Sequence, residues 1–203
     1  LLRQGFHRQF LTMERSDEEH ALPYENAQNG LVIEIHWVLM DARLGMHPDI
    51  DQLWQRTRSS SIANHPVFEM SPEDQVLHLC IHNSAHVFEM RLRALYDLDA
   101  TLRYYFKVID LNCLQQRARQ WKASRCVYIN TRLAKELLHS PLSHEWLESI
   151  KPESFIENYY ILAKEHLFLS VEQPNEALPG AAGVVRLWAA EGWGKKVRIL
   201  LRR

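Results

Sequence analysis

Residues 71–86 read SPEDQVLHLCIHNSAH, and this stretch decides the fold class. It opens on Ser71-Pro72-Glu73-Asp74, which is a strong helix start, because serine caps a helix, proline fits its first turn and acids complement its dipole. Apolar residues then recur three and four positions apart: Val76, Leu77, Cys80, Ile81, Ala85 and Phe88. The stretch therefore predicts a long amphipathic helix.

The helical pattern continues on both sides of this stretch. Asp49 or Asp51 can cap a helix that runs to about Arg58. After residue 88 the spacing predicts helices over residues 92–102, 110–121, 124–139, 153–170 and 182–201, which prolines separate. We therefore predict that the chain is helical from residue 48 onward, as one helical domain over residues 48–203.

The first 47 residues have a different character. Residues 31–38, LVIEIHWV, form the most strand-like segment of the chain and follow the turn signal Asn29-Gly30, which indicates a hairpin with residues 20–26. Residues 1–12 are expected to hold a short helix. The predicted fold class is α+β and predominantly α, with a small β-containing N-terminal piece over residues 1–47 followed by the helical lobe.

Composition excludes several classes of protein. The chain has 203 residues, of which 46% are hydrophobic and 24% are charged, which excludes a disordered chain, a collagen and a coiled coil. Its net charge of −1 argues against nucleic-acid binding by bulk charge. Apolar runs stay well short of the roughly 18 residues that a membrane span needs. Three cysteines without a C-x-x-C pair favour a reducing cytoplasm, and the absence of Met at residue 1 suggests a fragment of a longer protein.

Glu34 and His36 are the first candidate site residues. Side chains alternate between the two faces of a strand, so these two share one face, with their Cα atoms roughly 6–7 Å apart. A carboxylate between Ile33 and Ile35 is costly unless something pairs with it, and a divalent metal would serve. The alternative is that this face of the strand is simply exposed to solvent.

A histidine stripe is the second candidate. His78, His82 and His86 follow each other at intervals of four on the predicted helix, and such neighbours can bind a transition metal. Two other interpretations stay open: a polar border beside the core, and a surface that contacts phosphate or another domain.

Two D-x-D patterns resemble the carboxylate pairs that hold magnesium in phosphoryl transfer. Asp97 and Asp99 fall on a predicted helix, where residues two apart point in different directions, so they make a poor chelate, although Asp97 alone could contribute. Asp49 and Asp51 are explained by capping a helix.

Taken together, the motifs resemble a known family. The order is VIEIHWVL, then DQLWQRT, then SPEDQVLHLCIHNSAH and LRALYDL, over about residues 1–140. It is similar to a bacterial family of uncharacterised nucleotidyltransferases, which resembles the polymerase-β-like nucleotidyltransferases. Their catalytic piece carries a Gly-Ser helix start, a D-x-D strand and a third carboxylate on a later strand.

This resemblance implies roles for particular residues. Glu34 matches the third carboxylate, a ligand of the catalytic magnesium, and His36 matches the histidine that follows it. His82, His86 and Asp97 match recurrent positions of the helical lobe and would bind substrate. Residues 1–47 would then be the C-terminal portion of the catalytic α/β piece. No Gly-Ser dipeptide occurs in the chain, so we expect either that the Asp pair lies before residue 1 or that this is a degenerate member that has lost it. In both cases the 203 residues alone are expected to be inactive.

The expected activity is magnesium-dependent transfer of a nucleotide from a nucleoside triphosphate to an unknown acceptor. One alternative is a non-enzymatic helical adaptor that binds a partner protein or peptide. Another is a metal hydrolase built on the histidine stripe.

Overall fold

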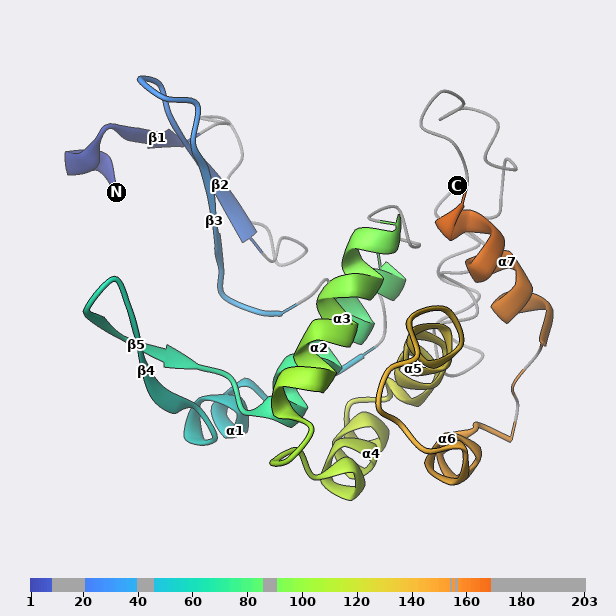
Figure 1. Ribbon diagram of the computed structural model, residues 1–203. Coiled ribbons are helices and arrows are strands. Elements are labelled where there is room, and N and C mark those ends of the chain that lie inside the picture. The colour runs from blue at the N-terminus through green and yellow to red at the C-terminus, as the bar shows by residue number, and fades with distance from the viewer. Residues whose placement is uncertain (9–20, 40–45, 86–90, 154, 156, 169–203) are drawn as a thin grey trace. The chain divides into compact units, whose positions relative to one another are not determined.

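A computed structural model describes residues 1–8, 21–39, 46–85, 91–153, 155 and 157–168, without the side chains of Arg91 and His166. The chain divides into two compact units, Leu1–Arg43 and Leu44–Arg203 (Figure 1). The fold class is α+β and predominantly α, as the sequence predicts: small antiparallel sheets come first and helices follow.

The first unit is a three-stranded antiparallel sheet in the order β1-β2-β3. Its strands are β1 (Phe6–Arg8), β2 (Ala21–Asn26) and β3 (Val32–His36). The predicted hairpin between β2 and β3 is confirmed, and Gly30 adopts φ 70° in the turn that joins them. The predicted helix over residues 1–12 is wrong beyond its first turn, because the 3-10 helix η1 (Leu2–Gln4) ends at Gly5, with φ 77°, and β1 follows.

The second unit opens with α1 (Ile50–Gln55) and an unpredicted hairpin. Asp49 caps α1 as expected, since its Oδ1 accepts a hydrogen bond from the Gln52 N–H at 3.0 Å. The prediction of continuous helix from residue 48 is wrong at β4 (Arg58–Ile62) and β5 (His65–Glu69). Ala63 and Asn64 both have positive φ, of 50° and 65°, which is the two-residue turn that matches the twist of a hairpin.

The remaining elements are helices. They are α2 (Pro72–Ala85), α3 (Arg91–Tyr105), α4 (Leu111–Gln120), α5 (Ser124–Leu138), α6 (His144–Ile150) and α7 (Glu157–Leu167). The predicted helices at 71–88, 92–102, 110–121 and 124–139 are confirmed within their described residues. The sequence did not predict α6, which Ser143 caps by accepting the Trp146 N–H at 3.0 Å. The helix predicted over residues 182–201 lies outside the described residues.

The core of the second unit forms around α2, which packs against α3, α4 and α5 (Figure 1). Its largest fully buried side chains include Leu77, Ile81, Leu95, Leu98, Leu102, Leu114, Tyr128, Ile129 and Leu133. These are the residues that the three- and four-residue spacing places on one face of each helix. No described helix combines the length and the apolar character that crossing a membrane requires.

A buried amide fixes the crossing of α2 and α5. The Asn130 Nδ2 donates to the backbone carbonyls of Cys80 and Cys126, at 3.1 and 2.9 Å, and lies 2.9 Å from the Ser84 hydroxyl. Its Oδ1 accepts from the amide of Asn83. Both amides are buried, so these hydrogen bonds replace those with water.

A buried charge cluster fixes the start of α2. Ser71 accepts the Asp74 N–H at 3.2 Å, as its role of helix cap requires. The Arg117 guanidinium of α4 lies 3.3 Å from the Glu73 carboxylate and 3.1 Å from that of Asp74. The Arg56 guanidinium also binds Asp74, whose side chain is fully buried. The acids of the SPED stretch therefore connect α2 to α1 and α4.

Candidate functional site

Glu34 and His36 lie side by side on β3, as strand alternation predicts. His36 Nε2 is 3.4 Å from Glu34 Oε2. The antiparallel register places them opposite Pro23 and Ala21 of β2. Their side chains are 59% and 38% exposed, so the pair is open to a ligand at the edge of the first unit.

A magnesium site needs more than this pair provides. Mg²⁺ is bound octahedrally by oxygen, usually by one or two carboxylates, several waters and substrate phosphates. Glu34 could supply one such oxygen. Within the described ranges, no group of three or more His, Cys, Asp or Glu side chains is arranged to hold a metal. The described residues therefore fit one ligand of a magnesium ion and do not complete its site.

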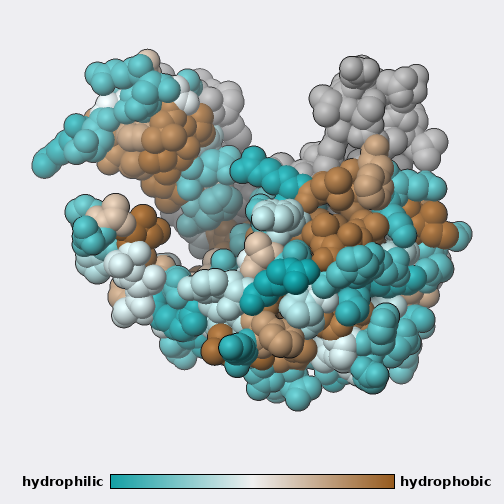
Figure 2. Space-filling model, in the orientation of Figure 1, coloured by the Kyte–Doolittle hydropathy of each residue, from teal (hydrophilic) through white to brown (hydrophobic). Residues whose placement is uncertain are grey.

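The sheet around the pair also exposes apolar side chains. Leu31, Val32 and Ile35 are 53%, 48% and 44% exposed, and apolar surface gathers over this sheet (Figure 2). Because side chains alternate along a strand, only Val32 of these three shares the face of Glu34 and His36.

The histidine stripe falls on α2 as predicted, but only in part within the described residues. The ring centroids of His78 and His82 are 5.8 Å apart, and both side chains are half-buried beside the core. This position fits the interpretation as a polar border. His86 lies outside the described residues, and its predicted substrate role stays a prediction, as does that of His82.

The second D-x-D pair separates into two different environments. Asp97 is exposed on α3, whereas Asp99 is buried, accepts from Arg103 Nε at 2.9 Å and from the Ser140 hydroxyl at 2.6 Å. The two carboxylates therefore do not form a chelate, as helical geometry predicts. Asp97 alone remains available to a ligand, which leaves its predicted role open.

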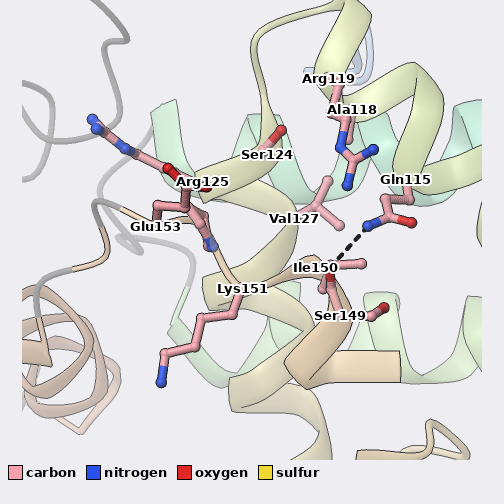
Figure 3. A pocket seen from close by; sticks show the side chains of 11 residues that line it. Gln115, Ala118, Arg119, Ser124, Arg125, Val127, Ser149, Ile150, Lys151 and Glu153 are labelled. Atoms are coloured by element: carbon pink, nitrogen blue, oxygen red, sulfur yellow. Dashed lines mark hydrogen bonds between the residues drawn. The ribbon is translucent and has the colours of Figure 1, made fainter. Parts of the chain in front are cut away.

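The sequence did not reveal a cavity of about 640 Å³ in the helical unit. Its lining comes from α4, the start of α5 and the end of α6: Gln115, Ala118, Arg119, Ser124, Arg125, Val127, Ser149, Ile150, Lys151, Pro152 and Glu153. Figure 3 shows the Arg119 guanidinium directed toward Gln115, whose Nε2 donates to the Ser149 carbonyl at 3.0 Å, while the side chains of Arg125 and Lys151 extend outward. The cationic groups diverge, so the cavity does not focus charge on one point.

Several titratable groups with shifted pKa values lie in a contact between α5 and α7. Arg132 donates to both carboxylate oxygens of Glu157, at 3.0 and 2.7 Å, and lies over the Tyr160 ring at 3.8 Å. These hydrogen bonds lower the pKa of Glu157, while burial and a hydrogen bond to Glu136 raise the pKa of the Tyr160 phenol. Each polar group here has a protein partner, which indicates that the cluster is structural.

Comparison with known proteins identifies the family. A family model described as "Uncharacterised nucleotidyltransferase" matches residues 1–139. No curated protein and no solved structure matches the chain. The matched range contains both the Glu34 strand and the SPED helix, and it covers more than half of the 203 residues. The chain therefore belongs to this family of uncharacterised nucleotidyltransferases.

Proposed function

We propose that the chain takes part in magnesium-dependent transfer of a nucleotide from a nucleoside triphosphate to an acceptor, in the manner of the polymerase-β-like enzymes. Membership of the nucleotidyltransferase family supports the class of reaction. The observation that carries the site is the Glu34 carboxylate, which shares a strand face with His36 and is open to a ligand.

In this proposal Glu34 supplies one carboxylate oxygen to the metal, whose chemistry is to stabilise charge on the transferring phosphoryl group. His36 lies within reach of Glu34, so an imidazole is held where it could contact the acceptor or a phosphate oxygen. The further carboxylates that such a site needs come from outside the described residues.

The helical unit is proposed to contact the substrates. Asp97 is exposed and has room for a ligand, and His82 keeps part of its ring accessible. Together with His86 they would recognise the nucleotide or the acceptor.

The decisive experiment measures transfer of label from each of the four nucleoside triphosphates, labelled at the α-phosphate, by the complete gene product. Glu34→Gln keeps the shape of the side chain and removes its charge. We expect it to lower transfer about 100-fold or more, since one preorganised electrostatic contact is worth that much, with an unchanged circular dichroism spectrum. Glu165→Gln, at an exposed position of α7 outside the proposed site, is the matched control and should keep its activity.

Full activity of Glu34→Gln would refute the assignment of this carboxylate. Calorimetry with ATP, GTP, CTP and UTP in the presence of magnesium tests the wider claim. If the complete gene product binds none of them, the non-enzymatic adaptor becomes the better interpretation.

A further inference from the structure

The hairpin β4–β5 is a sheet of only two strands, so each strand has one free edge among the described residues. We propose that β4 pairs with β4 of a second copy of the chain, antiparallel about Ser60, to form a continuous four-stranded sheet. This interaction is independent of the proposed nucleotide transfer.

The register determines which backbone groups face outward. Pro66 has no N–H and lies opposite Ser61, so this pair is one that exchanges no hydrogen bonds. The neighbouring pairs Ile62–His65 and Ser60–Val67 are then the hydrogen-bonded ones, as expected beside a two-residue turn. The N–H and C=O groups of Ser59 and Ser61 consequently point away from β5, and both residues are exposed.

The two edges of the hairpin differ in how they are protected. Proline and charged side chains on an edge strand hinder its pairing with a strand of another chain. Pro66 is the second residue of β5 and removes one of the two N–H groups that would face outward on that edge. On β4, the run Ser59-Ser60-Ser61-Ile62 carries no proline and no charge, so this edge can accept a strand.

A second copy of β4 fits this edge in one full-length register. Pairing about Ser60 places Ser59 opposite Ser61 of the second copy, and the reverse, so the outward groups of both copies meet as hydrogen-bonded pairs. Arg58, the only charge on β4, then faces Ile62 of the second copy and not another arginine. Its own charge is compensated by Glu69, at 2.8 Å. No like charges oppose each other, so the strand is self-complementary.

The exposed side chains also favour a wider sheet. Ile62 and Phe68 are 69% and 70% exposed, and apolar surface is visible on this hairpin (Figure 2). An isolated two-stranded hairpin is only marginally stable in water, whereas three or more strands support one another. Within one copy the hairpin contacts α3 through Arg58, whose Nη2 donates to the Tyr105 hydroxyl at 3.1 Å, and pairing of two hairpins would add cross-strand support to this contact.

Sedimentation velocity over a range of concentrations tests the proposal on the full chain. We expect wild type to shift from a monomer of 23.9 kDa to a dimer as concentration rises. Ser60→Lys and Ser60→Glu each place like charges directly across the two-fold axis and should weaken the dimer about fivefold. An equimolar mixture of the two variants should restore it, because the introduced lysine of one copy then faces the introduced glutamate of the other. His65→Lys, on β5 of the same hairpin, is the control and should leave the dimer unchanged.

Hydrogen exchange gives a second readout that needs no variant. The amides of Ser59 and Ser61 should become protected as concentration rises, whereas the amide of Phe68, which points outward on the β5 edge, should not. A monomer at every concentration, or a dimer that neither charge at residue 60 weakens, would overturn the proposal. Concentration-independent exchange at Ser59 and Ser61 would overturn it as well.

Discussion

The Arg56 guanidinium donates two hydrogen bonds to the buried Asp74 carboxylate, from Nε to Oδ2 at 2.8 Å and from Nη2 to Oδ1 at 3.1 Å. Arg117 approaches the same carboxylate from α4. Asp74 thus lies where α1, α2 and α4 meet, with a cation from each of its two neighbours. An acidic residue that the sequence identifies only as part of a helix start thus also holds three helices together.

Asp74→Ala should lower the free energy of unfolding by about 3–5 kcal/mol, because it leaves two largely buried arginines without their shared counter-charge. Urea denaturation at neutral pH measures this loss. Asp51→Asn, at an exposed position in α1, is the control and should change stability by less than about 0.5 kcal/mol. A loss below about 1 kcal/mol at Asp74 would contradict the role given to this cluster.

Substitution of the two aspartates of α3 should affect different properties: Asp99 the stability of the protein, and Asp97 the binding of substrate. Asp99→Asn weakens the contacts with Arg103 and Ser140 and should cost about 1–3 kcal/mol of unfolding free energy. Asp97→Asn is expected to leave stability within about 0.5 kcal/mol of wild type and to raise KM if Asp97 contacts substrate. Equal losses of stability in the two variants would show that the exposed and buried environments are misassigned.

The Arg132–Glu157 pair predicts that the free energy of unfolding decreases slightly as the pH is lowered. Hydrogen bonds from Arg132 hold the pKa of Glu157 below its ordinary value of 4.5. A carboxyl group whose pKa is lower in the folded state than in the unfolded state stabilises the protein at every pH above its unfolded-state pKa. This stabilisation is lost as the pH falls through the folded-state pKa. Since the Glu157 side chain is 51% exposed, solvent screening limits the effect to about 1 kcal/mol or less.

Urea denaturation at pH 7 and pH 3 measures this dependence. Glu157→Gln should be less stable than wild type at pH 7, and the difference should shrink at pH 3. Glu165→Gln, on the exposed side of the same helix, provides the comparison. A difference between wild type and Glu157→Gln that grows on acidification would reverse the sign of the linkage and contradict the pairing.

The three cysteines should react with very different rates. Cys80 and Cys126 are buried, and burial together with the neighbouring Cys126 raises the pKa of the Cys80 thiol, which reduces its thiolate fraction. Cys113 is half-exposed. A disulfide-exchange reagent should therefore modify one thiol rapidly in the native protein and three in denaturant. Cys113→Ser should remove the rapid phase, and a rapid phase that survives this change would show that the α2–α5 core is open to solvent.

Local chemistry explains what the sequence could predict of the fold. Asp49 and Ser71 predict helix starts because a capping side chain acts within three residues of itself, and the structure confirms both. The hairpin β4–β5 was missed because three serines and Pro66 give no alternation of apolar side chains and Ala63-Asn64 contains no glycine. Short helix α6 was missed because seven residues carry too little periodicity to detect.

The candidate site, too, could be predicted only where residues close together in the sequence determine its geometry. The proximity of Glu34 and His36 follows from the two-residue period of a strand, whereas their exposure depends on what packs near the sheet and has no local signal. The cavity beside Arg119 unites residues 115, 124 and 151, which only the packing of three helices brings together. That packing could not be derived from spacing along the chain.

The amide of Asn130 limits what residue 130 can be. By binding the carbonyls of Cys80 and Cys126 at once, it ties the backbone of α2 to that of α5 at one point. An apolar replacement of equal volume would fill the space and still leave the buried Asn83 amide and Ser84 hydroxyl without this partner.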